Sequence, residues 1–170
     1  GVAPAPHGNE NTTSAPSGTF RAADGPLNIA ANKDEQWQAL ARHLGRADLL
    51  ERADYATREA RKAHRAALKA ELETVLTTRP ARDWARELNA LGVPAGAVLT
   101  VPEALAHPQV AGRGLRATFE DVPGLDRAIE VLRTGARIDG APPAVDTPPP
   151  TLGQHNAEIY GALGLGADEI

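Results

Sequence analysis

The chain has 170 residues, with 18 Lys and Arg against 22 Asp and Glu and a net charge of −4. That length fits one domain, or one domain with an attached arm, and the nearly balanced charge argues against nucleic acid as the main partner. Cysteine is absent, which excludes disulfides, thiolate metal sites and a cysteine nucleophile. No apolar run is long enough to predict a membrane-spanning helix, and no segment has the pattern of a secretory signal.

The content of large apolar side chains is low. Alanine accounts for 33 residues, whereas Leu, Ile, Val and Phe together number 34, a fifth of the chain. A soluble chain with so few large apolar residues is near the limit for burying a self-sufficient core. Methionine is also absent, including at position 1. We therefore expect the chain to be a piece of a larger protein, with surface that another part would cover.

The first elements in chain order are a loop and a hairpin. Residues 1–17 are rich in Pro, Gly, Asn, Ser and Thr and predict a loop. Short apolar runs at 19–22 and 27–30 flank an Asp-Gly pair, which favours a β-hairpin because both residues tolerate positive φ. Pro26 indicates that the second strand begins at a sheet edge.

Helical spacing of apolar residues follows the hairpin. Asn32 is expected to cap the first helix, with Glu35 as its capping-box partner, and Gly45 ends it. The second helix is expected to start near Thr57 and to run past Leu76.

A third helix carries Pro80 in its first turn and stops at Gly92. Residues 93–99 predict a buried strand, and Thr100 with Glu103 predicts a capping box for a short fourth helix that ends by Pro108. The core-facing stripes of the first three helices are Trp37, Leu40, Ala41 and Leu44; then Leu68, Leu72, Val75 and Leu76; then Trp84, Leu88 and Leu91.

The remainder of the chain changes character. Residues 115–119 and 128–132 predict a second hairpin. Residues 141–151 hold five prolines and predict an extended arm, because proline cannot take a full part in a β-ladder. Residues 157–163 predict a last short helix, closed by Gly164. The fold class predicted is α+β, mostly helical, with a long tail.

The residues alone show no self-contained active site. The five histidines lack zinc-ligand spacing, and there is no nucleophile elbow, Walker A loop or dinucleotide-binding glycine motif. No pair of acidic residues is specially placed. One feature leaves a binding function open: the small polar loop leads directly into a hairpin, and such loops often close over ligands.

Several segments, taken in order and spacing over about residues 8–166, match one known pattern. They are Gly8–Pro16, Phe20–Gly25, Ile29–Asn32 with Trp37, Leu44–Arg46, Arg61–Arg65, Trp84 with Gly92–Val98, His107–Val110 and Pro148–His155. This ordered set resembles the class III CoA-transferases, the CaiB/BaiF family, which includes formyl-CoA transferase and carnitine CoA-transferase.

The resemblance implies the C-terminal portion of a two-domain enzyme. Residues 1–112 would form the small α+β domain. Residues 113–170 would be a linker hairpin, a Pro-rich arm and a C-terminal helix that returns to a Rossmann-like large domain, which this chain lacks. Family members form interlocked homodimers, so the full-length protein is expected to do the same. Its expected location is the cytoplasm.

The resemblance also implies the chemistry. Members move CoA from an acyl-CoA thioester to a carboxylic acid, with no tightly bound cofactor and no metal. Their nucleophile is an Asp of the large domain, so no catalytic residue is assigned within this chain, and the isolated chain is expected to be inactive.

Two segments match substrate-contacting regions of the family. The first matches a glycine-rich loop that closes over the active site, but the glycine run is missing here, so its mobility and its preference for oxalate or formate do not carry over. The candidate substrate-binding residues in it are Asn11, Thr12, Thr13, Ser14 and Ala15.

The second segment lies near CoA in the family, and its candidate residues are Ala30, Ala31, Asn32 and Lys33. Helix capping is the stronger interpretation of Asn32. Lys33 could pair with a CoA phosphate, although an ordinary solvent-exposed lysine explains it better.

Two alternatives stay open. An α-methylacyl-CoA racemase resembles the same region, but those enzymes place a Glu near the position of Lys33, which weighs modestly against this alternative. The other alternative is a non-enzymatic helical interaction module.

Overall fold

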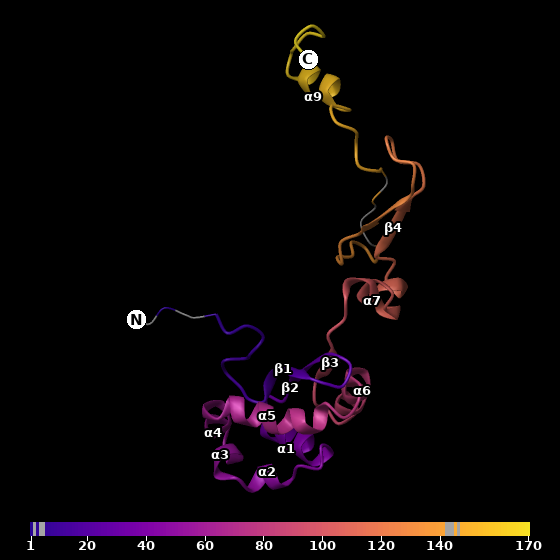
Figure 1. The fold of residues 1–170 in the computed structure, drawn as a ribbon. Coiled ribbons are helices and arrows are strands. Elements are labelled where there is room, and N and C mark those ends of the chain that lie inside the picture. The colour runs from indigo at the N-terminus through magenta and orange to yellow at the C-terminus, as the bar shows by residue number, and fades with distance from the viewer. Residues whose placement is uncertain (2, 4–5, 142–144, 146) are drawn as a thin grey trace. The chain divides into compact units, whose positions relative to one another are not determined.

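The computed structural model describes residues 1, 3, 6–141, 145 and 147–170 (Figure 1). Its contacts divide the chain into two units, Gly1–Val98 and Leu99–Ile170. Both units combine helices with a short antiparallel sheet, which confirms the predicted α+β class. The division falls before residue 112, where the boundary of the small domain was expected, and that boundary stays a prediction.

A three-stranded antiparallel sheet forms one layer of the first unit. Its order is β1 (Ser17–Arg21), β2 (Pro26–Ala30) and β3 (Ala95–Ala97), and the predicted hairpin is β1 with β2. Pro26 does not mark an edge, because β2 is the central strand. It is the first residue of that strand, where a missing N–H interrupts no ladder. The strand expected over 93–99 is shorter and only half-buried.

Helices cover the inner face of this sheet. The longer ones match the predicted periods, whereas two single-turn helices after residue 47 were not predicted. The helices of the unit are α1 (Asp34–His43), α2 (Asp48–Glu51), α3 (Ala53–Ala56), α4 (Arg58–Ala63), α5 (Arg65–Leu76) and α6 (Ala81–Ala90).

Two helix boundaries differ from the prediction. Asn32 is not the cap of α1; Lys33 is, and its N–H donates to Gln36 Oε1 at 3.1 Å. The chain is still tied to the sheet at Ala31, whose N–H donates to the Pro16 carbonyl, so the helix begins later. The long helix expected from Thr57 is broken at His64, whose φ of −104° and ψ of 24° depart from helical values, although its N–H still donates to the Ala60 carbonyl at 3.0 Å.

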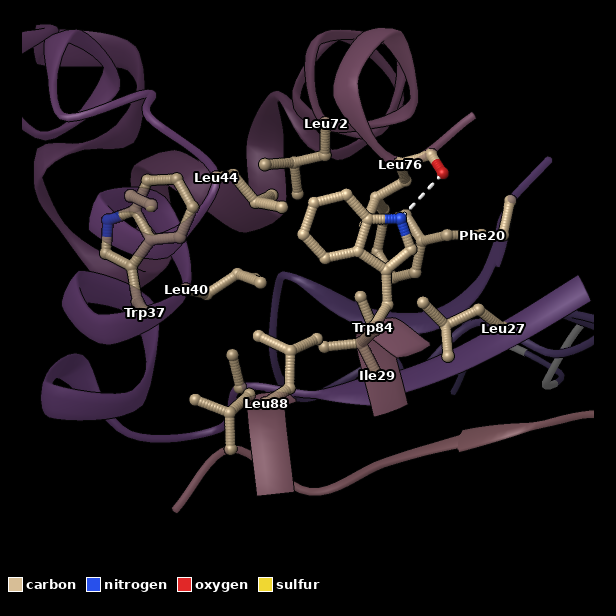
Figure 2. Close-up of a cluster of buried hydrophobic side chains, with 14 of the residues drawn as sticks. Phe20, Leu27, Ile29, Trp37, Leu40, Leu44, Leu72, Leu76, Trp84 and Leu88 are labelled. Atoms are coloured by element: carbon tan, nitrogen blue, oxygen red, sulfur yellow. Dashed lines mark hydrogen bonds between the residues drawn. The ribbon is translucent and has the colours of Figure 1, made fainter. Parts of the chain in front are cut away.

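The core of the unit lies between the sheet and helices α1, α5 and α6 (Figure 2). Trp84 Nε1 donates to the Leu76 carbonyl at 2.9 Å, so the buried indole is satisfied. Leu91, expected on the same stripe, is 49% exposed, because it is the C-cap of α6. The labelled members of the cluster are Phe20, Leu27, Ile29, Trp37, Leu40, Leu44, Leu72, Leu76, Trp84 and Leu88.

The second unit buries little apolar surface. Among its described residues only Ala117 and Val122 are buried apolar side chains. The predicted capping box, the second hairpin and the last helix are confirmed, whereas α8 was not predicted. The Pro-rich arm lies partly outside the described residues. The elements are α7 (Val101–Leu105), α8 (Pro108–Gly112), β4 (Arg116–Phe119), β5 (Ile129–Leu132) and α9 (Asn156–Ala162).

Two findings concern possible sites across the part of the chain that the structure describes. No helix there has both the length and the apolar character needed to cross a bilayer. The same residues contain no group of three or more His, Asp or Glu side chains arranged to hold a metal ion.

A charged cluster joins α1 to α6 at the rim of the core. Glu87 accepts hydrogen bonds from Arg79, at 2.5 and 3.0 Å, and lies 3.0 Å from His43 Nε2. The Arg79 guanidinium, with a smaller contribution from His43, lowers the pKa of Glu87 from its ordinary value of 4.5 to about 2.

The stability of the chain is therefore expected to fall in acid partly through Glu87. Because the pKa of this carboxyl is lower in the folded chain, its contribution is present above pH 4.5 and is lost as the pH falls towards 2. Glu87→Gln should be less stable than wild type at pH 7 and should approach it near pH 2. Urea unfolding across this range measures the difference. Arg79→Met should remove the same pH-dependent part, and a Glu87→Gln profile parallel to wild type would contradict the assignment.

Candidate functional site

A hollow of about 540 Å³ opens in the first unit, beside the start of β1. It combines the N-terminal segment with the sheet and with the residue that follows β3. Of the predicted loop residues, Asn11 is in its wall. The lining residues are Gly8, Asn9, Glu10, Asn11, Ser17, Gly18, Asn28 and Val98.

Gly18 allows the N-terminal segment to lie close against β1. Its φ is +152°, a conformation that other residues rarely adopt, and an added Cβ would lie 2.8 Å from Glu10 Oε2 and 3.0 Å from the Asn9 carbonyl. The Asn11 N–H donates to the Ser17 carbonyl at 3.1 Å. The wall of the hollow is thus fixed to the first strand at two neighbouring points.

Glu10 ties the same wall to α5. Its carboxylate accepts a hydrogen bond from Lys69 Nζ at 2.8 Å, and Arg65 Nη1 lies 3.9 Å away. The Lys69 ammonium also lies 5.7 Å from the centre of the Phe20 ring. Since two cations face Glu10, its negative charge is largely balanced within the protein.

Asn28 lies on the sheet face opposite the core, because its neighbours Leu27 and Ile29 are the buried ones. Its Oδ1 accepts a hydrogen bond from the Thr19 hydroxyl at 2.6 Å. With Asn9 and Asn11, it is one of three lining residues whose side chains are carboxamides. Carboxamides are neutral groups that both donate and accept, and they suit a ligand with carboxylate or carbonyl oxygens.

A second hollow of about 300 Å³ borders the first, with Asn28 in both walls. Ala30 of the predicted CoA segment lines this second, more apolar hollow. The two predicted segments also meet through the backbone, because the Ala31 N–H donates to the Pro16 carbonyl at 3.1 Å. The structure therefore brings the loop and the end of β2 side by side.

The remaining predicted residues differ in exposure. In the loop, Thr12 and Thr13 are exposed, whereas Ser14 and Ala15 are buried. The Ser14 hydroxyl is buried without a hydrogen-bond partner among the described residues.

The exposed end of the predicted CoA segment is next to acidic groups. Asn32 and Lys33 are exposed, and the first turn of α1 that follows them contains Asp34 and Glu35. These carboxylates occupy the helix end that otherwise favours anions. The assignment of both segments to substrate or CoA stays a prediction.

Sequence reasoning missed the residues that hold the loop. Three arginines of α4 and α5, at positions 58, 61 and 65, donate to backbone carbonyls of residues 13–15. Their spacing of three and four residues places them on one side of a helix and was visible in the sequence. Nothing local indicated that this side faces a loop more than forty residues earlier.

The family model described as CoA-transferase family III matches residues 1–156. The chain belongs to CoA-transferase family III. This CoA-transferase family III chain is 39% identical over 142 residues to a probable fatty acyl-CoA transferase of Mycobacterium tuberculosis, covering 84% of this chain and 35% of that protein. It is 31% identical to a succinate–glutarate CoA-transferase of Agrobacterium fabrum, over 92% of this chain and 38% of that one.

Comparison with solved structures leads to the same family. A CaiB/BaiF family protein from Brucella suis matches with a TM-score of 0.77 and 35% identity, covering 95% of this chain and 41% of that one. The family III chain thus spans about two fifths of the length of the relatives it matches. The family membership predicted from the ordered motifs is confirmed.

Proposed function

We propose that this chain is part of an enzyme that moves CoA from an acyl-CoA thioester to a carboxylic acid, and that the carboxamide-lined hollow is its contribution to the substrate site. The family match over residues 1–156 carries the proposal. The hollow supports it, because one of its walls is the loop that the family resemblance associates with substrate.

Within this proposal the chain binds and orients, and the rest of the protein supplies the nucleophile. The three carboxamides and the anchored loop provide fixed hydrogen-bonding groups, which lower the cost of orienting a substrate. The coenzyme A thioester is a substrate and not a resident cofactor. The large domain as a partner, the interlocked homodimer and a cytoplasmic location belong to the proposal through the family resemblance.

The expected result is CoA exchange by the full-length protein and none by the 170-residue chain alone. The assay mixes an acyl-CoA with a panel of free carboxylic acids and identifies new acyl-CoA species by mass spectrometry. Repeating it in D₂O tests the alternatives, since a racemase would incorporate deuterium at the α-carbon without exchanging CoA. An interaction module would do neither. Turnover by the isolated chain would contradict the assignment of the nucleophile to the rest of the protein.

A further inference from the structure

Three arginines fix the second half of the loop to α4 and α5. Their guanidinium groups donate to three consecutive backbone carbonyls, and such charge-assisted hydrogen bonds are stronger than neutral ones. Residues 13–15 of the loop are therefore anchored, whereas the preceding residues 8–11 form the wall of the 540 Å³ hollow. The pairs are Arg58 with Thr13, Arg65 with Ser14, and Arg61 with Ala15.

Arg58 reaches the hollow through a relay of hydrogen bonds. Its Nε and Nη2 both donate to the Thr13 carbonyl, at 3.1 and 2.9 Å. The N–H and the hydroxyl of Thr13 each donate to Asn11 Oδ1 at 2.8 Å. The Asn11 N–H in turn donates to the Ser17 carbonyl at the start of β1. The relay links α4 to Asn11, although Arg58 itself does not line the hollow.

The relay decides which end of the Asn11 side chain meets a ligand. Two donors from Thr13 occupy Oδ1, so the carboxamide is held in one orientation. No described residue accepts a hydrogen bond from its Nδ2, so that amino group is an unused donor on a residue that lines the hollow. An amide donor of this kind complements a carboxylate oxygen.

Of the three arginines, Arg58 is the one whose hydrogen bonds to described residues all go to the loop. Arg61 is buried and also donates to the Tyr55 carbonyl and to Asp34, so it supports the core. Arg65 lies further from its carbonyl, at 3.4 Å, and also faces Glu10. Arg58 is exposed, so its removal should disturb the loop without disturbing the core.

We propose that Arg58 is a positioning residue, which acts through Thr13 to orient the Asn11 carboxamide so that Nδ2 donates to the carboxylate of the acid substrate. This inference rests on the proposed CoA transfer, and it adds a substrate contact and the residue that orients it. Arg58 touches no substrate.

The test is a double-mutant cycle in the full-length protein, with Asn11→Ala, Arg58→Ala and both together. Each single change should raise KM for the acid roughly fivefold, the effect of losing one hydrogen bond, with little change in kcat. The double variant should be no worse than Asn11→Ala alone, because Arg58 acts only through Asn11. Arg58→Lys should recover part of the loss. Arg42→Ala is the matched control, since this exposed arginine of α1 bonds Gln38 and not the loop.

Other outcomes separate this inference from the proposed function. Losses that add in the double variant, or a wild-type KM in Arg58→Ala, overturn the positioning role. Amide hydrogen exchange gives a readout independent of activity: Arg58→Ala should speed exchange at Asn11 and Thr13, and unchanged exchange at both also overturns the inference. A full-length protein without CoA transfer overturns the proposed function, and the inference with it.

Discussion

Replacing Arg61 by alanine is expected to lower the free energy of unfolding by about 2–6 kcal/mol, because it leaves two buried carbonyls without a donor and each costs about 1–3 kcal/mol. The Arg61 side chain is only 2% exposed, and it donates to the Ala15 carbonyl at 3.0 Å and to the Tyr55 carbonyl at 3.1 Å. Its ion pair with Asp34 adds little, because that carboxylate is 68% exposed.

Urea unfolding monitored by circular dichroism measures this change. Arg61→Lys keeps the charge but cannot serve two carbonyls in a fixed fork, so it should recover only part of the loss. Arg42→Ala, an exposed arginine on α1, is the matched control and should change stability by less than about 0.5 kcal/mol. A loss below about 1 kcal/mol in Arg61→Ala would show that other groups or water satisfy the two carbonyls.

The burial of Arg61 is a feature that sequence periodicity could not predict. The apolar stripes and the Asp-Gly turn predicted the core helices and the first hairpin, because these depend on neighbours within a few residues. The burial of Arg61 depends on the Ala15 carbonyl, 46 positions away in the chain. An arginine is assumed to be exposed unless paired, so nothing near it in sequence predicted its place in the core.

The boundaries of α1 and α5 were less predictable for a related reason. Asn32 is the better N-cap by residue type, yet the bond from Ala31 to Pro16 extends the sheet and delays the helix. A continuous helix from Thr57 fits the periodicity, and the break lies at the non-helical backbone of His64, which the periodicity does not indicate. At the start of α1, one tertiary contact thus outweighs the local capping preference.

The candidate site was predicted in part. The loop segment was predicted and its Asn11 lies in the wall of the hollow, whereas Asn28 was not among the predicted site residues. The hollow itself depends on where distant segments meet: Gly8–Asn11 crosses β1 at Gly18, and pairing of β3 with β2 brings Val98 beside them. Sequence spacing carries no information on such a meeting point.

Replacing Trp84 by alanine is the second change expected to have a large effect, at about 3–5 kcal/mol of lost stability. The indole is 4% exposed and fills the centre of the cluster that α5, α6 and the sheet share (Figure 2). The indole also packs edge-on against His43, with 5.9 Å between the two ring centres. The Arg79 guanidinium lies 4.5 Å from the centre of the Trp84 ring. Truncation therefore leaves a cavity and removes the donor to the Leu76 carbonyl.

Two variants separate these contributions to the effect of Trp84. Trp84→Phe keeps most of the apolar volume and loses the hydrogen bond, so its loss should fall between wild type and Trp84→Ala. Leu91→Ala is the control on the same predicted stripe, and because Leu91 is 49% exposed it should cost only about 1 kcal/mol. Equal losses for Trp84→Ala and Leu91→Ala would contradict this core, since they would mean that the sequence period, and not the observed burial, determines which residues stabilise the fold.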